Sequence, residues 1–221
     1  MSTSDHWHCP ASILACDAGK HVYVEKPVSH NVREGRLLVE AAERNKVVVQ
    51  HGTQSRSTDH VRKAMEVLQS GAIGEVLVSK AWNSQKRGTI GKSKPQEPPA
   101  YLDFELWLGP APKVAYRPNM LPGIWRWWYD FGCGDIGNDG SPDLAAHHRN
   151  FLAAVRGEAK VRADALTAHL SSSLCHLGNI AVRTGRVLNF DPAREQVLGD
   201  EESNALVRRK YSGHWGVPKG V

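Results

Sequence analysis

The sequence lacks the features that mark secreted, membrane-spanning or metal-binding proteins. Its four cysteines form no Cys-x-x-Cys pair and show no zinc-type spacing, so we expect free thiols and no metal site. No apolar run approaches the ~20 residues that cross a bilayer. No charged segment followed by an apolar core marks a signal peptide. These absences favour a cytoplasmic protein without a membrane partner.

Charge of one sign is not concentrated anywhere along the chain. The net charge is +5, but no run of five or more like charges occurs. A scattered basic balance of this kind fits small anionic molecules better than nucleic acid, so no nucleic-acid partner is expected. The length of 221 residues, without internal repeats, allows one large domain or two small ones.

Short apolar runs that alternate with helical patterns predict a parallel sheet near the start of the chain. The predicted segments are a helix at Pro10–Ala18, a strand at His21–Val24, a helix from a cap at Ser29 or Asn31 to Asn45 with Glu34 on its wet side, and a strand at Val47–Val49. This αβαβ order is typical of parallel sheets with right-handed crossovers. Ligands bind at the carboxyl ends of such strands.

The remainder of the chain predicts a more helical region. The predicted segments are a helix from Val61 to Leu68, a strand at Glu75–Ser84, an irregular stretch over 85–123, a helix from Pro142 to Arg156, a helix from Ala163 to Thr184 and a strand at Val187–Phe190. Three tryptophans lie within Ile124–Phe131, where burial is favoured over sugar stacking.

Lys26 is the sharpest candidate for chemistry, because it directly follows the first predicted strand. A lysine there can act as an acid or base, or orient a substrate hydroxyl as hydride leaves. Glu25 can accept a hydrogen bond from a ribose hydroxyl. The alternative is a surface lysine beside a solvated carboxylate.

Polar residues before the first strand are candidates for contact with a cofactor. Asp5 and His8 are expected on a loop that faces it, with His6 exposed. The His-x-His pair also suggests a metal, but no further ligand completes a set at helical spacing.

Gln54 and Arg56 follow the second predicted strand and can meet an anionic or polyhydroxylated substrate, unless they are merely solvated. Asp135 and Asp139 lie in a glycine-rich loop, where they either bind a substrate hydroxyl or form the turn. His147 and His148 are expected to be buried or to cap a helix, and His169 and His176 to lie next to the core.

Several motifs, in order, resemble the Gfo/Idh/MocA (glucose-fructose oxidoreductase / inositol dehydrogenase) family. They are Asp5–His8, Ala18–Val22, Glu25–Pro27, Gly71–Val76, Leu102–Asp103 with Trp107–Pro110, Gly134–Gly140, His148–Arg156 and Cys175–Ala181. The resemblance spans nearly the whole chain.

The resemblance implies an α/β fold in which a partial Rossmann-type parallel sheet (residues 1–52) precedes a reduced α+β substrate domain (residues 53–221). It implies NAD or NADP as cofactor and a sugar, sugar derivative or polyol as substrate. Lys26 takes the family's catalytic position, and Asp5, His8 and Glu25 lie on the cofactor side.

The family's glycine-rich phosphate loop has no counterpart before Thr3, and a second gap follows Gly140. The sequence therefore predicts a chain truncated at its N-terminus and internally, with weak or absent NAD(P) binding. The alternative is a non-catalytic fragment or pseudoenzyme. Edges left by missing strands would then pair it with a full-length relative, or with copies of itself as a homo-oligomer.

Overall fold

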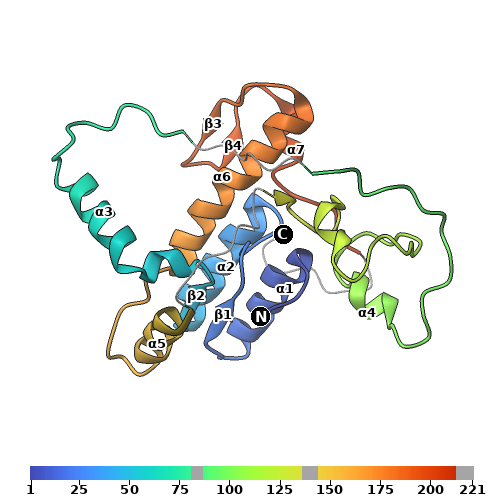
Figure 1. Ribbon diagram of the computed structural model, residues 1–221, viewed down its shortest axis with the longest axis horizontal. Coiled ribbons are helices and arrows are strands. Elements are labelled where there is room, and N and C mark those ends of the chain that lie inside the picture. Colours follow the sequence, from blue (N-terminus) through green and yellow to red (C-terminus); the bar gives the residue numbers. More distant parts are fainter. Residues whose placement is uncertain (81–86, 136–143, 213–221) are drawn as a thin grey trace.

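A small parallel sheet with helices around it forms the centre of the computed structural model (Figure 1), which describes residues 1–80, 87–135 and 144–212. The elements are α1 (Asp5–Asp17), β1 (Val22–Val24), α2 (Val32–Asn45), β2 (Val49–His51), η1 (Gln54–Ser57), α3 (Asp59–Gln69), α4 (Phe104–Leu108), η2 (Ile124–Trp127), α5 (Leu144–Val155), α6 (Ala165–Thr184), β3 (Phe190–Asp191), β4 (Gln196–Val197) and α7 (Glu201–Ala205).

The predicted αβαβ order is confirmed. β1 and β2 pair in parallel, with Val22 opposite Val49 and Val24 opposite His51. The Asn31 side chain accepts a hydrogen bond from the Glu34 N–H and caps α2 as expected. β2 begins two residues later than predicted, because Val47 and Val48 lead into the strand rather than forming it.

The prediction of a loop at residues 5–8 is wrong, since α1 begins at Asp5 and contains Pro10. A proline inside a helix leaves the carbonyl four residues earlier without its N–H donor. Here that carbonyl belongs to His6, and Arg209 Nη2 donates to it at 3.0 Å. The predicted exposure of His6 is also wrong, because its side chain is fully buried.

The predicted solvent exposure of Glu34 is wrong as well. Glu34 is fully buried, and its carboxylate lies 2.8 Å from Arg209 Nε. Tyr211 Oη donates to the same oxygen at 2.8 Å. The amphipathic pattern of α2 could not show these partners, because they come from the other end of the chain.

The main apolar core lies between α1, α2 and the sheet, and α6 completes it. Ala165 and Ala168 of α6 pack against this core. A Cβ on Gly35 would stand 2.5 Å from His169 Nδ1, so glycine at this position lets α6 approach α2 closely. His169 and His176 are both buried, as predicted, and so is His147, whereas the predicted burial of His148 is wrong, because its side chain is exposed on α5.

Aromatic side chains build a second core within residues 87–135, which are largely irregular. Trp125 and Phe131 are buried there, so burial of the tryptophan-rich stretch is confirmed for Trp125. The His6 ring packs edge-on against Trp107 and Phe131, at 5.3 and 5.2 Å between ring centroids. This contact joins the second core to α1.

The strand predicted at 75–84 is not formed over its described part. Residues 75–80 are extended and exposed, with Leu77 at 82%, and no strand of the described chain pairs with them. A strand needs a partner for its ladder and its apolar face, and none is within reach. Residues 81–84 lie outside the described ranges.

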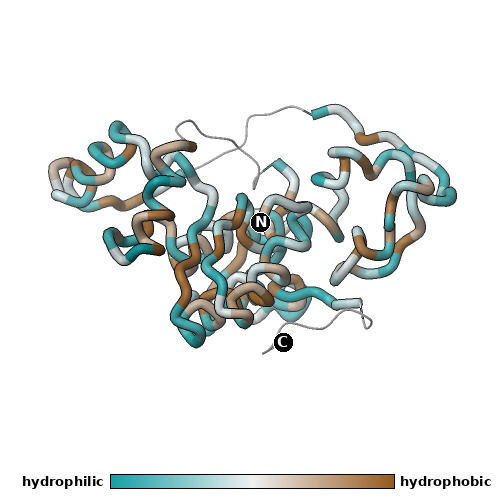
Figure 2. The backbone as a smooth tube through the Cα atoms, turned by 90° about the horizontal axis from the view of Figure 1, so that it is seen from below, coloured by the Kyte–Doolittle hydropathy of each residue, from teal (hydrophilic) through white to brown (hydrophobic). Residues whose placement is uncertain are grey.

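The helix predicted at 61–68 is confirmed as α3, yet none of its residues is buried. Figure 1 shows α3 set apart from the sheet, and Figure 2 shows hydrophobic positions both in the centre and in the outlying parts.

The two late helices are confirmed as α5 and α6. Gly185 ends α6 in the left-handed conformation, as its position predicted. The strand predicted at 187–190 is displaced to β3, which pairs antiparallel with β4. Among the described residues, no helix has both the length and the apolar character needed to cross a membrane.

Candidate functional site

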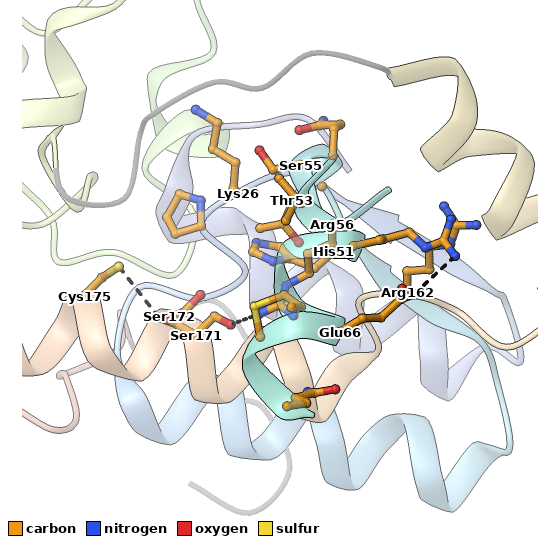
Figure 3. A pocket seen from close by; sticks show the side chains of 17 residues that line it. Lys26, His51, Thr53, Ser55, Arg56, Glu66, Arg162, Ser171, Ser172 and Cys175 are labelled. Carbon is orange, nitrogen blue, oxygen red and sulfur yellow. Dashed lines mark hydrogen bonds and ion pairs between the residues drawn. The ribbon is translucent and has the colours of Figure 1, made fainter. Parts of the chain in front are cut away.

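A cavity of about 710 Å³ opens at the carboxyl ends of β1 and β2 (Figure 3). Lys26 and Pro27 contribute from the loop after β1. His51 and the residues through Arg56 contribute from the end of β2 and from η1. The other walls come from α3, from Arg162 and from three residues of α6: Ser171, Ser172 and Cys175. The predicted candidates Lys26, Gln54 and Arg56 are thus brought together.

The loop that carries Lys26 is held from behind by His8. His8 Nδ1 lies 2.7 Å from the Pro27 carbonyl, and His8 Nε2 lies 3.1 Å from the Thr3 carbonyl and 3.4 Å from the Thr3 N–H. Burial lowers the pKa of His8, because it penalises the charged form of the ring. His8 therefore positions the loop and does not line the cavity.

Glu25 lies between the two strand ends. Gln54 Nε2 donates to Glu25 Oε1 at 3.2 Å and lies 3.3 Å from Tyr23 Oη. A Cβ on Gly52 would come within 2.9 Å of the Glu25 carboxylate, so a larger residue at this position would displace the carboxylate. The carboxylate thereby orients the amide of Gln54.

His51, the last residue of β2, was missed by the sequence interpretation. Its side chain is only 3% exposed, and neither ring nitrogen has a partner in the described part of the chain. Burial lowers its pKa to about 3, so the ring is neutral at physiological pH. The Thr53 hydroxyl beside it is also buried without a partner. The signal available was a histidine at a strand end directly before glycine.

Positive charge dominates the far wall of the cavity. Arg56 Nη2 donates to Ser171 Oγ at 3.0 Å, and Arg162 Nη1 donates to the Ser57 carbonyl at 3.2 Å. Arg62 also lines the cavity but pairs with Asp59 at 3.0 Å. The chemistry available is therefore a lysine, a neutral imidazole, hydroxyls and guanidinium groups around one opening.

Two predicted site residues lie elsewhere. Asp5 Oδ2 accepts a hydrogen bond from the Cys133 N–H at 2.9 Å, and burial raises its pKa to about 6. Asp135 pairs with Arg87 at 2.9 Å. Neither lines the cavity, and Asp139 lies outside the described residues. In the described part, no three His, Cys, Asp or Glu side chains gather as metal ligands.

The spacing G-x-G-x-x-G occurs once, at Gly132, Gly134 and Gly137, and the sequence interpretation overlooked it. A dinucleotide-binding loop of this type follows a strand and opens a helix. Here the turn follows η2, and the Gly132 N–H donates to the Trp128 carbonyl. The Cys133 N–H within it is already occupied by Asp5. The local structure therefore does not match a Rossmann phosphate loop.

Comparison with known families gives two matches that together cover most of the chain. Residues 2–53 match a family described as "Oxidoreductase family, NAD-binding Rossmann fold". Residues 57–141 and 139–217 match "Oxidoreductase family, C-terminal alpha/beta domain".

Curated relatives match over shorter stretches. The levoglucosan dehydrogenase of Pseudarthrobacter phenanthrenivorans is 31% identical over 77 residues, which are 35% of this chain and 20% of that protein. The trans-1,2-dihydrobenzene-1,2-diol dehydrogenase of Mus musculus is 35% identical over 81 residues, 37% of this chain and 24% of that protein. The chain thus spans about a fifth to a quarter of these relatives' length.

Solved structures show a limited likeness. An inositol dehydrogenase homolog from Azotobacter vinelandii, complexed with NADH and myo-inositol, is 29% identical with a TM-score of 0.32, and the match covers 34% of this chain and 20% of that chain. An aldose-aldose oxidoreductase from Caulobacter crescentus, complexed with glycerol, is 30% identical with a TM-score of 0.30 and covers 32% and 21%. At these TM-scores the likeness carries no further argument.

Proposed function

This chain belongs to the Gfo/Idh/MocA oxidoreductase family, and on that premise we propose that its cavity serves NAD(P)-dependent oxidation or reduction of a sugar, sugar derivative or polyol. The observation that carries the proposal is the convergence of Lys26, the unpartnered His51 and Gln54 at the carboxyl ends of two parallel strands. Ligands of open parallel sheets bind at this edge.

In this proposal the residues divide between substrate and cofactor. In the direction of reduction the Lys26 ammonium gives a proton to the oxygen of the carbonyl that receives hydride, and in the direction of oxidation the Lys26 amine takes the proton of the reacting hydroxyl. Gln54 and Arg56 hold other groups of the substrate, with Asp135 as a further candidate from outside the cavity. Glu25 serves the ribose side of the cofactor, and Asp5 and His8 act on that side through the loops they hold.

The test is turnover by the 221-residue chain at millimolar NAD(P)⁺, with a panel of polyols, followed as absorbance of the reduced nicotinamide. Lys26→Met is expected to lower kcat by about 10²-fold or more, since it removes the group that takes the hydroxyl proton. Lys20→Met is the matched control, because Lys20 is exposed and outside the cavity. Equal rates for the two variants would contradict the role of Lys26.

The residues present fit a dinucleotide only at its nicotinamide end. The unpartnered Thr53 hydroxyl and the Glu25 carboxylate lie at the sheet edge, whereas no described helix N-terminus opens from a glycine-rich turn after a strand. Bound nicotinamide would supply or accept hydride. The chain's own residues there orient ribose and substrate.

We expect the 221-residue chain to bind NADH and NADPH very weakly or not at all. Without a phosphate loop the cofactor loses most of its fixed contacts, and poor positioning forfeits effective molarity worth ~7–11 kcal/mol. Isothermal titration calorimetry tests this expectation. A dissociation constant in the micromolar range or tighter would contradict it.

A second candidate function is a non-catalytic module that pairs with a full-length relative or with copies of itself. Exposed apolar side chains on and after α3 favour it: Met65 is 45% exposed and Ile73 64%. Absence of turnover together with a particle larger than a monomer in light scattering would favour this candidate.

Two further expectations belong to this proposal. We place the boundary between the cofactor-binding part, residues 1–52, and the substrate part, residues 53–221, directly after Gly52. We also place the chain in the cytoplasm, and the support for this is that all four cysteines are free thiols.

A further inference from the structure

We propose that the cavity selects a polyhydroxylated substrate that carries an anionic group, a carboxylate or a phosphate, and that Arg56 and Arg162 bind this group. The inference rests on the proposed function, because it concerns the same cavity. It specifies that the substrate carries a negative charge, and it names the residues that bind the charged group.

Arg56 and Arg162 meet at η1 from distant parts of the chain. The Arg162 guanidinium donates to the carbonyl of Ser57, the residue that follows Arg56. Arg56 itself reaches across to Ser171 on α6. Both side chains therefore line the cavity with a hydrogen bond to or from η1, and Figure 3 labels both.

The hydrogen bonds recorded for these two guanidinium groups go to neutral oxygens. A guanidinium carries five N–H donors, so one bond to a serine hydroxyl or a carbonyl leaves most of them for a ligand. Glu66 is the single carboxylate among the lining residues, and it lies 3.9 Å from Arg62. Planar guanidinium groups of this kind match carboxylate and phosphate oxygens.

The same cavity also offers groups that suit hydroxyls. His51 and Thr53 present buried polar atoms without partners in the described chain, and Lys26 lines the cavity with them. Buried polar groups are normally hydrogen-bonded, and substrate hydroxyls would satisfy these. A cavity that combines these groups with two guanidinium groups fits a polyol that carries one anionic group.

The experiment measures binding and not turnover. The complete chain is titrated by calorimetry, with and without NAD⁺, using D-gluconate, D-glucitol 6-phosphate and the neutral D-glucitol. At least one anionic ligand is expected to bind about tenfold tighter than D-glucitol, and the difference is expected to shrink as salt is raised. The ligand that binds identifies carboxylate or phosphate.

Variants locate the contact. Arg56→Gln and Arg162→Gln are each expected to weaken binding of the anionic ligand about tenfold and binding of D-glucitol much less, so that the preference for the anionic ligand is lost. Arg62→Gln is the matched control: it removes the same charge from the same cavity, but Arg62 already pairs with Asp59. Its effect should stay within about twofold. Thermal unfolding of each variant checks that the fold is retained.

Equal affinity for charged and neutral polyols would overturn the inference, and so would the absence of binding for all three ligands. Binding of inorganic pyrophosphate in the absence of any binding of the anionic polyols would also overturn it, because the arginines would then be assigned to the cofactor. Binding of the anionic ligand without any turnover would overturn the proposed oxidoreductase function instead. Turnover of D-glucitol without preference for the anionic ligands would overturn only the inference.

Discussion

Replacing Arg209 with methionine is expected to lower the free energy of unfolding by about 3–5 kcal/mol, because it leaves a buried carboxylate without its cation. Glu34 is fully buried and lies 2.8 Å from Arg209 Nε, whose side chain is itself only 8% exposed. The variant also removes the donor to the His6 carbonyl that Pro10 leaves unpaired. Urea unfolding measures the effect as a lower midpoint at an unchanged slope.

The neighbouring Arg208 offers a matched control, because it is exposed. Arg208→Met should stay within about 0.5 kcal/mol. The double variant Glu34→Gln with Arg209→Met should regain much of the lost stability, since no buried charge then lacks a partner. Equal midpoints for Arg208→Met and Arg209→Met would show that the ion pair does not stabilise the fold.

The protein is expected to unfold cooperatively near pH 5. Seven histidines have pKa values lowered mainly by desolvation, which penalises their charged form. They are His6 and His176, each to about 4, His51, to about 3, and His8, His30, His147 and His169. In the unfolded chain these rings take up protons near pH 6.5, whereas in the folded chain they stay neutral to a lower pH.

The sign of the pH dependence follows from proton uptake. As pH falls from 6.5 towards 4, the unfolded state binds more protons than the native state, so stability falls. Asp5 has the opposite effect. Burial raises its pKa to about 6, so the native state takes up a proton at Asp5 before the unfolded state does, and this proton uptake stabilises the native state as pH falls. One such carboxyl does not outweigh seven histidines, because each pKa unit corresponds to about 1.36 kcal/mol.

Tryptophan fluorescence and far-ultraviolet circular dichroism against pH measure this transition. His51→Gln should shift the midpoint downward by about half a pH unit, because it removes one proton-binding site without breaking a hydrogen bond of the ring. His60→Gln, on the exposed α3, is the control and should leave the midpoint unchanged. A fold that persists at pH 3 would contradict the argument.

The sequence predicted those parts of the fold that depend on neighbouring residues. The periodicity of α2, its cap at Asn31 and the glycine that ends α6 are local patterns, and each is confirmed. The burial of Glu34 and the helix at residues 5–8 were missed, because Glu34 and the His6 carbonyl both have Arg209 as a partner. Local patterns contain no information about such a distant contact.

The residues of the candidate site also fall into those that local sequence predicts and those that it does not. Lys26, Gln54 and Arg56 could be predicted, because strand ends in a parallel sheet meet at one edge. Arg162 and Ser171 could not, since they reach η1 across 105 and 115 residues of chain. His51 was within reach of sequence reasoning, because it follows the apolar run Val47–Val49 closely and stands directly before a glycine.

The hydrogen bond between Arg209 and the His6 carbonyl joins residues 203 positions apart. At ribosomal rates of 5–20 residues per second, α1 is synthesised about 10–40 s before the arginine that completes it. Until then, the His6 carbonyl and the Glu34 carboxylate retain water, and α1 and α2 cannot close their final contact. The N-terminal helices therefore stay partly hydrated until residue 209 has been synthesised, which makes this chain a candidate for chaperone binding while it is being made.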